Sequence, residues 1–245
     1  MKVAVIPARF DSSRFPGKPL ALIAGKPMVI RVWEQAIKIP GVDLVAVATD
    51  DGLIANAVRD AGGIAWMTGE HQSGTDRIAE ACSLMPADAI VLNVQGDLPF
   101  FRPEVGAELI RALESDPGAD IATPVIAVKD DIVPTSKNAV KAVFGSSGNA
   151  LYFSRAVIPF VREITDGPLW YRHIGVYCYR NSALQRFAKL PQSRLEKIEC
   201  LEQLRALENG MKIKCVVVDK DCGPEINCPN DLKRLQEEQN GIAAC

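Results

Sequence analysis

A short segment near the N-terminus places cationic and glycine residues directly after an apolar run. Residues 7–18 contain Arg9, Arg14, Gly17 and Lys18, with hydroxyl and carboxylate side chains between them. Arginines bind phosphate oxygens bidentately, a lysine adds a point charge, and exposed backbone N–H groups supply further donors. The segment therefore predicts a polyphosphate site, with a solvated basic loop as the alternative. It matches neither the Walker A motif nor the Gly-x-Gly-x-x-Gly dinucleotide motif.

A second position with chemical potential is Asp97, which ends the turn Gln95-Gly96-Asp97 after the apolar run 89–94. A carboxylate there can bind a hard cation that bridges phosphate and sugar oxygens. Because Asp next to Gly is also common in turns, a purely structural role is the alternative. Gln95 has no charge and can hydrogen-bond either a base or a sugar hydroxyl.

The first half of the chain alternates apolar runs with helical patterns. The elements that these patterns predict would position the residues described above. Strands are predicted at Val3–Ile6, Leu44–Ala48, Ile64–Met67 and Ala89–Val94, and helices at Pro27–Ile39, Asp51–Ala61, Thr75–Ser83 and Glu104–Glu114. This order predicts a mostly parallel sheet flanked by helices. Ligands of such sheets gather at the carboxyl ends of the strands. The loops after Ile6, Ala48, Met67 and Val94 are therefore the candidate site.

The second half is less regular and predicts an additional mixed β/α region. Further strands are expected at Ile121–Val128, Ala139–Phe144, Ala150–Ser154, His173–Tyr179 and Met211–Val218. Leu195–Glu208 is predicted to be one amphipathic helix, and a last helix runs from Pro229 to about Gln239. There is no linker rich in Pro, Gly and Ser, so a single domain over residues 1–245 is the prediction.

Composition excludes several classes of protein. The 28 basic and 30 acidic residues give a net charge of −2, which argues against binding to nucleic acid through its phosphates. Seven scattered cysteines without a CxxC pair, and only two histidines, fit neither a disulfide framework nor a structural zinc site. No apolar stretch approaches the ~18 residues of a membrane span. A cytoplasmic protein is expected.

Specific motifs then point to one family. The segment Ile6-Pro7-Ala8-Arg9 through Ser13-Arg14-Phe15-Pro16-Gly17-Lys18-Pro19-Leu20 resembles the signature loop of the sugar cytidylyltransferases. Six later segments resemble the 3-deoxy-manno-octulosonate cytidylyltransferase family and occur in its order: Val47-Ala48-Thr49-Asp50-Asp51, His71-Gln72-Ser73-Gly74-Thr75-Asp76-Arg77, Val94-Gln95-Gly96-Asp97, Ala150-Leu151-Tyr152-Phe153-Ser154-Arg155, His173-Ile174-Gly175-Val176-Tyr177 and Leu201-Glu202-Gln203-Leu204-Arg205. They cover nearly the whole chain.

The resemblance implies a fold, a reaction and partners. The fold would be the Rossmann-like nucleotide-diphospho-sugar transferase fold. The reaction would be attack of the anomeric hydroxyl of 3-deoxy-D-manno-octulosonate (Kdo) on the α-phosphate of CTP, with Mg²⁺ as cofactor and pyrophosphate as leaving group. It also implies a cytoplasmic homodimer that supplies CMP-Kdo for lipopolysaccharide and binds neither nucleic acid nor membrane.

The family's functional positions map onto named residues of this chain. The resemblance assigns catalysis to Arg9, Lys18 and Asp97, and nucleotide binding to Ala8, Arg9, Arg14, Lys18, Ser73, Gly74, Arg77 and Gln95. Ser73 and Thr75 are also plausible helix N-caps, and Arg77 could equally be a salt-bridged helix residue. Sugar binding is assigned to Gln95, Arg155, His173, Tyr177, Glu199, Glu202 and Gln203. For His173 the alternative is a packed residue beside a strand, and for the three helical residues a solvated face.

Two positions depart from the family's pattern. Leu98 stands where the family has glutamate, and Asn227 stands where it has the aspartate that joins the Gln-Gly-Asp carboxylate in binding Mg²⁺. Metal ligation is therefore assigned to Asp97 and Asn227, with weaker binding expected because asparagine is neutral. Three alternatives stay open: an acceptor that is a relative of Kdo, a sialic-type acceptor, and a catalytically silent nucleotide-binding homologue.

Overall fold

The computed structural model describes residues 1–11, 15–128, 135–164 and 166–235. Its contacts divide the chain into two compact units. The N-terminal unit comprises residues 2–84, 93–104 and those from 222 onward; the C-terminal unit comprises residue 1, residues 85–92 and residues 105–221. The single domain over residues 1–245 stays a prediction.

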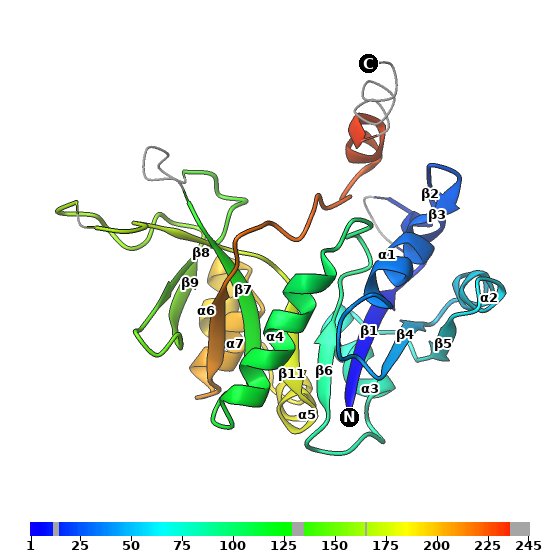
Figure 1. Cartoon of the computed structure of the whole chain (residues 1–245), viewed down its shortest axis with the longest axis horizontal. Helices are drawn as coiled ribbons and strands as arrows, with labels where there is room; N and C mark the ends of the chain where they lie inside the picture. The colour runs from blue at the N-terminus through cyan, green and yellow to red at the C-terminus, as the bar shows by residue number, and fades with distance from the viewer. Residues whose placement is uncertain (12–14, 129–134, 165, 236–245) are drawn as a thin grey trace. The chain divides into compact units, whose positions relative to one another are not determined.

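The N-terminal unit contains a parallel sheet in the order β5-β4-β1 (Figure 1). Its strands are β1 (Lys2–Ala8), β4 (Leu44–Thr49) and β5 (Ile64–Met67). Val3 lies opposite Leu44 and Ala46 opposite Ile64. The four residues from Val3 to Ile6 are fully buried, as expected of a parallel strand covered on both faces. The parallel arrangement predicted for the first half is confirmed in these strands.

The N-terminal unit contains the helices α1 (Met28–Ala36), α2 (Gly52–Asp60) and α3 (Gly74–Ala81). Two of these three, α2 and α3, begin at residues whose side chains cap them. The carboxylate of Asp51 accepts a hydrogen bond from the N–H of Ile54 at 2.9 Å, and the Ser73 hydroxyl caps α3. Such caps satisfy donors that the first helical turn leaves unpaired. Because α3 contacts β1, its N-terminus lies beside the end of that strand.

Two short elements connect β1 to α1. A 3₁₀ helix, η1, spans Lys18–Leu20, and the hairpin β2 (Leu22–Ile23) and β3 (Lys26–Pro27) follows it. Gly17 precedes η1 with a φ of 69°, in the left-handed region that glycine tolerates best. This turn sets the position of Lys18.

The C-terminal unit is built around a mixed sheet in the order β6-β11-β7-β10-β8-β9, with β12 parallel to β7. Antiparallel pairing joins β7 to β10 and β11, and β8 to β9 and β10. This confirms the mixed region predicted for the second half. The strands are β6 (Ile90–Asn93), β7 (Ile121–Ala127), β8 (Lys141–Phe144), β9 (Ala150–Ser154), β10 (Tyr171–His173), β11 (Tyr177–Arg180) and β12 (Ile213–Val217).

The single strand predicted at His173–Tyr179 is wrong, because the structure divides it into β10 and β11. His173 pairs with Val125 and Cys178 with Ala122, so five residue steps on this side face only three on β7. The surplus forms a bulge at residues 174–176, and Gly175 therefore does not share a strand face with Tyr177. A bulge of this kind redirects side chains and is frequent beside functional sites.

The single helix predicted at Leu195–Glu208 is also wrong. The structure has α6 (Arg194–Glu199) and α7 (Gln203–Glu208), separated at Cys200, whose φ of 51° is left-handed. Glu199, Glu202 and Gln203 are therefore not neighbours on one helix. The unit also contains α4 (Pro103–Ser115), which was predicted, and α5 (Asn181–Ala188), which was not.

The segment from Cys222 onward packs on the N-terminal unit. A Cβ on Gly223 would lie 2.7 Å from the carbonyl oxygen of Phe100, so this close approach requires glycine. Ile226 and Leu235 are buried in one cluster with Ile23 and Met28. Residues 229–235 are helical as predicted, and the remainder of that predicted helix lies outside the described residues. None of the helices in the described ranges has the length and hydropathy needed to cross a membrane.

Candidate active site

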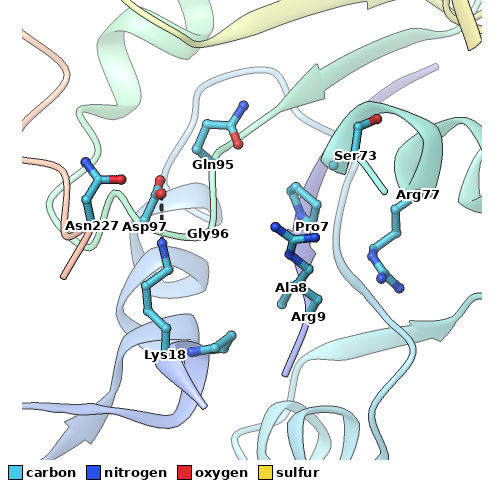
Figure 2. Close-up of a pocket in the computed structure, with 12 residues that line it drawn as sticks. Pro7, Ala8, Arg9, Lys18, Ser73, Arg77, Gln95, Gly96, Asp97 and Asn227 are labelled. Carbon is cyan, nitrogen blue, oxygen red and sulfur yellow. Dashed lines mark hydrogen bonds and ion pairs between the residues drawn. The ribbon is translucent and has the colours of Figure 1, made fainter. Parts of the chain in front are cut away.

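A cavity of about 210 Å³ lies at the carboxyl end of β1 in the N-terminal unit (Figure 2). It brings together all the sequence-predicted nucleotide and metal residues that the structure describes: Ala8, Arg9, Lys18, Ser73, Gly74, Arg77, Gln95, Asp97 and Asn227. Arg14, also predicted to bind nucleotide, lies outside the described residues. Of the four loops predicted to form the site, those after Ile6, Met67 and Val94 contribute residues to this cavity, and the loop after Ala48 does not.

Lys18 and Asp97 form an ion pair in this cavity. The Nζ of Lys18 lies 3.0 Å from the Oδ2 of Asp97 and donates to the carbonyl oxygen of Ile226 at 3.2 Å. The N–H of Ile226 in turn donates to the carbonyl oxygen of Asp97 at 3.0 Å. Figure 2 shows the two side chains pointing toward one another. Lys18 thus connects the loop after β1, the turn at Asp97 and the segment that contains Asn227.

Gly96 allows the turn at Asp97 to approach β1. A Cβ at this position would lie 2.6 Å from the carbonyl oxygen of Pro7, a distance that backbone atoms cannot tolerate. The N–H of Val94 also donates to the carbonyl oxygen of Val5 at 3.0 Å. The backbone at Gly96 therefore packs directly on the end of β1, which brings Asp97 close to Lys18. Nothing in the local sequence marks Gly96 for this packing role, since the atom it approaches lies on another strand, β1.

The N-terminus of α3 forms another wall of the cavity. The Ser73 side chain accepts a hydrogen bond from the N–H of Asp76 at 3.1 Å, so its predicted capping role is confirmed. A Cβ on Gly74 would approach the Pro7 ring at 3.2 Å, so the helix starts close to the end of β1. The amide groups and dipole of a helix N-terminus favour anions. This wall can therefore bind a phosphate as well as line a nucleotide pocket.

Two arginines predicted to bind nucleotide differ in their surroundings. Arg9 is exposed, and its guanidinium donates to the carbonyl oxygen of Gln72 at 3.4 Å. Arg77 is 2% exposed and forms an ion pair with Asp50 at 2.5 Å, with a further bond to Thr68 at 2.6 Å. Figure 2 shows it directed away from Asp97. The salt-bridged alternative therefore holds for Arg77, which stabilises the wall, whereas Arg9 can reach a ligand.

Asn227 has a side-chain orientation suited to ligation. Its Nδ2 donates to Glu225 at 3.2 Å, and Figure 2 shows its oxygen turned toward Asp97. The backbone N–H groups of Asn227 and Cys228 both donate to Asp231 at 2.9 Å, which lowers the pKa of that carboxyl group. Asp231, which sequence reasoning gave no role, thereby fixes the loop. Leu98, at the other departure from the pattern, is a buried core residue.

A hard cation fits this donor set, though with little negative charge to hold it. Asp97 and Asn227 offer oxygen atoms on the same cavity, which is the chemistry that Mg²⁺ prefers. Asp97 is the sole carboxylate among the described residues that line it. The part of the chain that the structure describes contains no group of three or more His, Cys, Asp or Glu residues able to hold a metal. Phosphate oxygens of a bound nucleotide would have to complete the coordination.

Arg155 and Glu199, predicted to bind sugar, contact each other in the C-terminal unit. The guanidinium of Arg155 donates to the carbonyl oxygens of Glu199 at 2.8 Å, Lys137 at 2.9 Å and Cys200 at 3.2 Å. The carboxylate of Glu199 accepts from the N–H of Arg155 at 2.9 Å and from a neighbouring serine hydroxyl. The pair therefore ends α6 and holds it on β9.

Lys141 supports this arrangement from within the unit. It is fully buried, and its ammonium donates to the carbonyl oxygens of Arg155 at 2.5 Å, Ala139 at 2.6 Å and Ser136 at 3.1 Å. Its burial lowers its pKa. Sequence reasoning did not find this residue, since a lysine in a strand pattern gives no local sign of being buried.

The other predicted sugar residues are also in the C-terminal unit. His173 and Tyr177 have ring centroids 5.5 Å apart, on either side of the bulge. Glu202 pairs with Arg205 at 3.6 Å. Gln203 is 5% exposed, and its side-chain nitrogen is buried without a hydrogen-bond partner among the described residues. An unpaired buried amide is unfavourable, so a ligand that accepts its hydrogen bond would stabilise it.

Comparison with known proteins gives a consistent family assignment. The family model described as cytidylyltransferase matches residues 3–213. An 8-amino-3,8-dideoxy-manno-octulosonate cytidylyltransferase from Shewanella pealeana is 50% identical over 94% of both chains. A 3-deoxy-manno-octulosonate cytidylyltransferase from Syntrophus aciditrophicus is 47% identical over 96% of both.

Solved structures confirm the fold. A structure of CMP:2-keto-3-deoxy-manno-octonic acid synthetase complexed with CTP has a TM-score of 0.90 and 40% identity, covering 98% of this chain and 99% of the other. A 4-diphosphocytidyl-2C-methyl-D-erythritol synthase from Anaerococcus prevotii, 12% identical with a TM-score of 0.62, shares the fold alone. Because the family model covers most of the chain and relatives are about half identical over nearly its whole length, the chain belongs to the cytidylyltransferase family.

Proposed function

We propose that the protein transfers CMP from CTP to the anomeric hydroxyl of Kdo, giving CMP-Kdo and pyrophosphate. The observation that carries this proposal is the cavity that Lys18, Asp97, Arg9 and the N-terminus of α3 line together. Relatives about half identical over nearly their whole length, named for this reaction or for its 8-amino counterpart, support it.

The proposed reaction needs alignment and charge neutralisation more than covalent catalysis. The sugar hydroxyl gives its proton to solvent water as its oxygen bonds to the α-phosphorus, and the bond from that phosphorus to the pyrophosphate oxygen breaks. Lys18 and Arg9 would neutralise the charge that develops on the departing pyrophosphate. The amide groups at the start of α3 would hold the nucleotide, and Gln95 can hydrogen-bond the cytosine or the sugar.

We also propose Mg²⁺ as the cofactor, held by Asp97, Asn227 and nucleotide oxygens. When bound, it would supply a positive charge to the phosphate oxygens of CTP. The chain's own contribution is to present Asp97 through the Gly96 turn and Asn227 through the Asp231 cap. The neutral amide at position 227 leaves one negative charge where two carboxylates would provide two.

Replacing Asn227 with aspartate is expected to lower the Mg²⁺ concentration at half-maximal rate on the order of tenfold, since ligand charge tunes affinity for hard cations. A Mg²⁺ titration of the initial rate at saturating CTP and sugar measures it. Asn230→Asp is the matched control, because it adds the same charge to an exposed residue outside the cavity. If Asn227→Asp and the unaltered protein reach half-maximal rate at the same Mg²⁺ concentration, Asn227 is not a metal ligand.

The acceptor itself is tested by pyrophosphate release from CTP with three sugars. Kdo is expected to give the highest kcat/KM. The 8-amino-3,8-dideoxy sugar is the second candidate, favoured by the 50% identical relative named for it. A preference for a sialic acid would overturn the Kdo assignment, and no product with any of the three would leave a silent nucleotide-binding protein.

Assembly and location complete the proposal. The motifs shared with the family imply a homodimer that works in the cytoplasm and provides activated sugar for lipopolysaccharide. Light scattering at micromolar concentration tests the dimer, for which a mass near the 26.6 kDa of one chain would be the contrary result.

A further inference from the structure

Thr123 lies opposite the bulge that separates β10 from β11. It is fully buried in β7, and its hydroxyl oxygen has three polar neighbours within the C-terminal unit. The carbonyl oxygen of Val176 is at 2.8 Å, that of Ile174 at 3.3 Å, and the Nε2 of His173 at 2.9 Å. The bulge thus directs two carbonyl groups at this hydroxyl, and His173, the last residue of β10, directs its imidazole nitrogen at it.

The number of protons decides how these groups interact. A threonine hydroxyl has one proton to donate, and carbonyl oxygens can only accept. The hydroxyl proton is therefore directed to a carbonyl, with Val176 the nearer, because an oxygen–oxygen contact of 2.8 Å without a proton would be repulsive. His173 must then be the donor of the third contact, so its Nε2 carries a hydrogen.

The surroundings of His173 favour a ring without charge. It is 7% exposed, and the Phe153 ring meets it edge-on with centroids 5.0 Å apart. Burial, with a smaller contribution from the Arg172 charge, lowers the pKa of His173 to about 3. An imidazole that is neutral and protonated at Nε2 has a lone pair at Nδ1, which accepts hydrogen bonds and cannot donate them.

We propose that Thr123 is a positioning residue that fixes His173 as the neutral Nε2–H tautomer. In a sugar site at His173, which the resemblance to the family implies, this tautomer accepts a hydrogen bond from a sugar hydroxyl at Nδ1 and cannot act as a cation toward the sugar carboxylate. This rests on the proposed function for the identity of the ligand. The tautomer itself is a property of the ligand-free protein.

Nitrogen NMR of ¹⁵N-histidine-labelled protein tests the tautomer directly. The chain has two histidines, and a His71→Gln variant identifies the signals of the other. At pH 7 the His173 Nε2 is expected at a pyrrole-type shift and its Nδ1 at a pyridine-type shift. An imidazolium pattern, or a proton on Nδ1, in the unaltered protein would overturn the proposal without reference to any substrate.

Two substitutions then test the link to the sugar. Thr123→Val removes the hydroxyl that accepts from Nε2–H while keeping the shape of the side chain, so the Nδ1–H tautomer should also become populated. The KM for the sugar should rise about tenfold, and the KM for CTP should stay unchanged. Thr123→Ser keeps the hydroxyl and should restore both signatures. Should the valine variant fail to fold, the serine variant and the unaltered protein still decide the tautomer. If Thr123→Val populates the Nδ1–H tautomer without any rise in the KM for the sugar, His173 does not bind the acceptor.

Discussion

Replacing Asp97 with asparagine is expected to lower kcat about a thousandfold while leaving the fold intact. Asp97 is the sole carboxylate among the described residues that line the cavity. It pairs with Lys18 and would be the charged ligand of the proposed Mg²⁺. Loss of one preorganised electrostatic group of this kind typically lowers kcat by ~10²–10³-fold. The amide keeps the shape of the carboxylate but removes its charge, so Lys18 loses its counterion and the cation its charged ligand.

Steady-state kinetics at saturating CTP and sugar, over a range of Mg²⁺ concentrations, measure this effect. Asp60→Asn is the matched control, because the same chemical change occurs on an exposed residue at the end of α2, outside the cavity. That control should stay within about twofold of the unaltered protein, as surface changes usually do. A kcat for Asp97→Asn above one tenth of the unaltered value, at saturating Mg²⁺, would contradict the role assigned to this carboxylate.

Replacing Arg205 with methionine is expected to lower the free energy of unfolding by about 3–5 kcal/mol, since removal of one partner leaves a buried charge without compensation. Arg205 donates to both oxygens of Glu196, at 2.6 Å and 2.9 Å, and the two side chains are 8% and 7% exposed. The guanidinium also lies 4.7 Å from the centre of the Phe187 ring. The pair joins α6 to α7 and therefore fixes the helix that begins at Gln203.

A double variant separates charge from packing. Glu196 also completes a capping box, in which its carboxylate accepts from the N–H of Ser193 and its own N–H donates to the Ser193 hydroxyl. Glu196→Gln keeps an acceptor for that cap while removing the charge. Urea unfolding of Arg205→Met with Glu196→Gln should therefore recover much of the lost free energy. A loss below about 1 kcal/mol in the single variant would show that the ion pair contributes little.

The regular elements of the N-terminal unit could be predicted because their causes are local. Short apolar runs such as Val3–Ile6 are buried on both faces, and the caps Asp51 and Ser73 stand directly before their helices. The same is true of the candidate site, since in a parallel sheet the loops after the strands converge on one edge. The described nucleotide and metal residues therefore all line one cavity.

The two wrong elements have causes that lie far away in the chain. The helix around Cys200 is interrupted where the guanidinium of Arg155, the residue directly after β9, donates to the carbonyl oxygens of Glu199 and Cys200. The strand after His173 is interrupted where Thr123 of β7 takes the carbonyl oxygens of the bulge. No local sequence pattern encodes either contact. A prediction based on hydrophobic periodicity therefore continued each element through the residues at which it ends in the structure. The contacts between Arg155 and Glu199 follow from the same long-range packing, and their predicted sugar-binding roles stay predictions.

The contact between Lys18 and Asp97 also bears on the order of events at the cavity. With the ammonium 3.0 Å from the carboxylate, the charge of Asp97 is balanced by that of Lys18, so this carboxylate attracts a lone divalent ion only weakly. A triphosphate would attract the ammonium of Lys18 toward its own oxygens, which would leave the carboxylate of Asp97 free to bind a cation. We therefore expect the metal to bind together with the nucleotide. Measurements of manganese binding should then show higher affinity in the presence of CTP than in its absence.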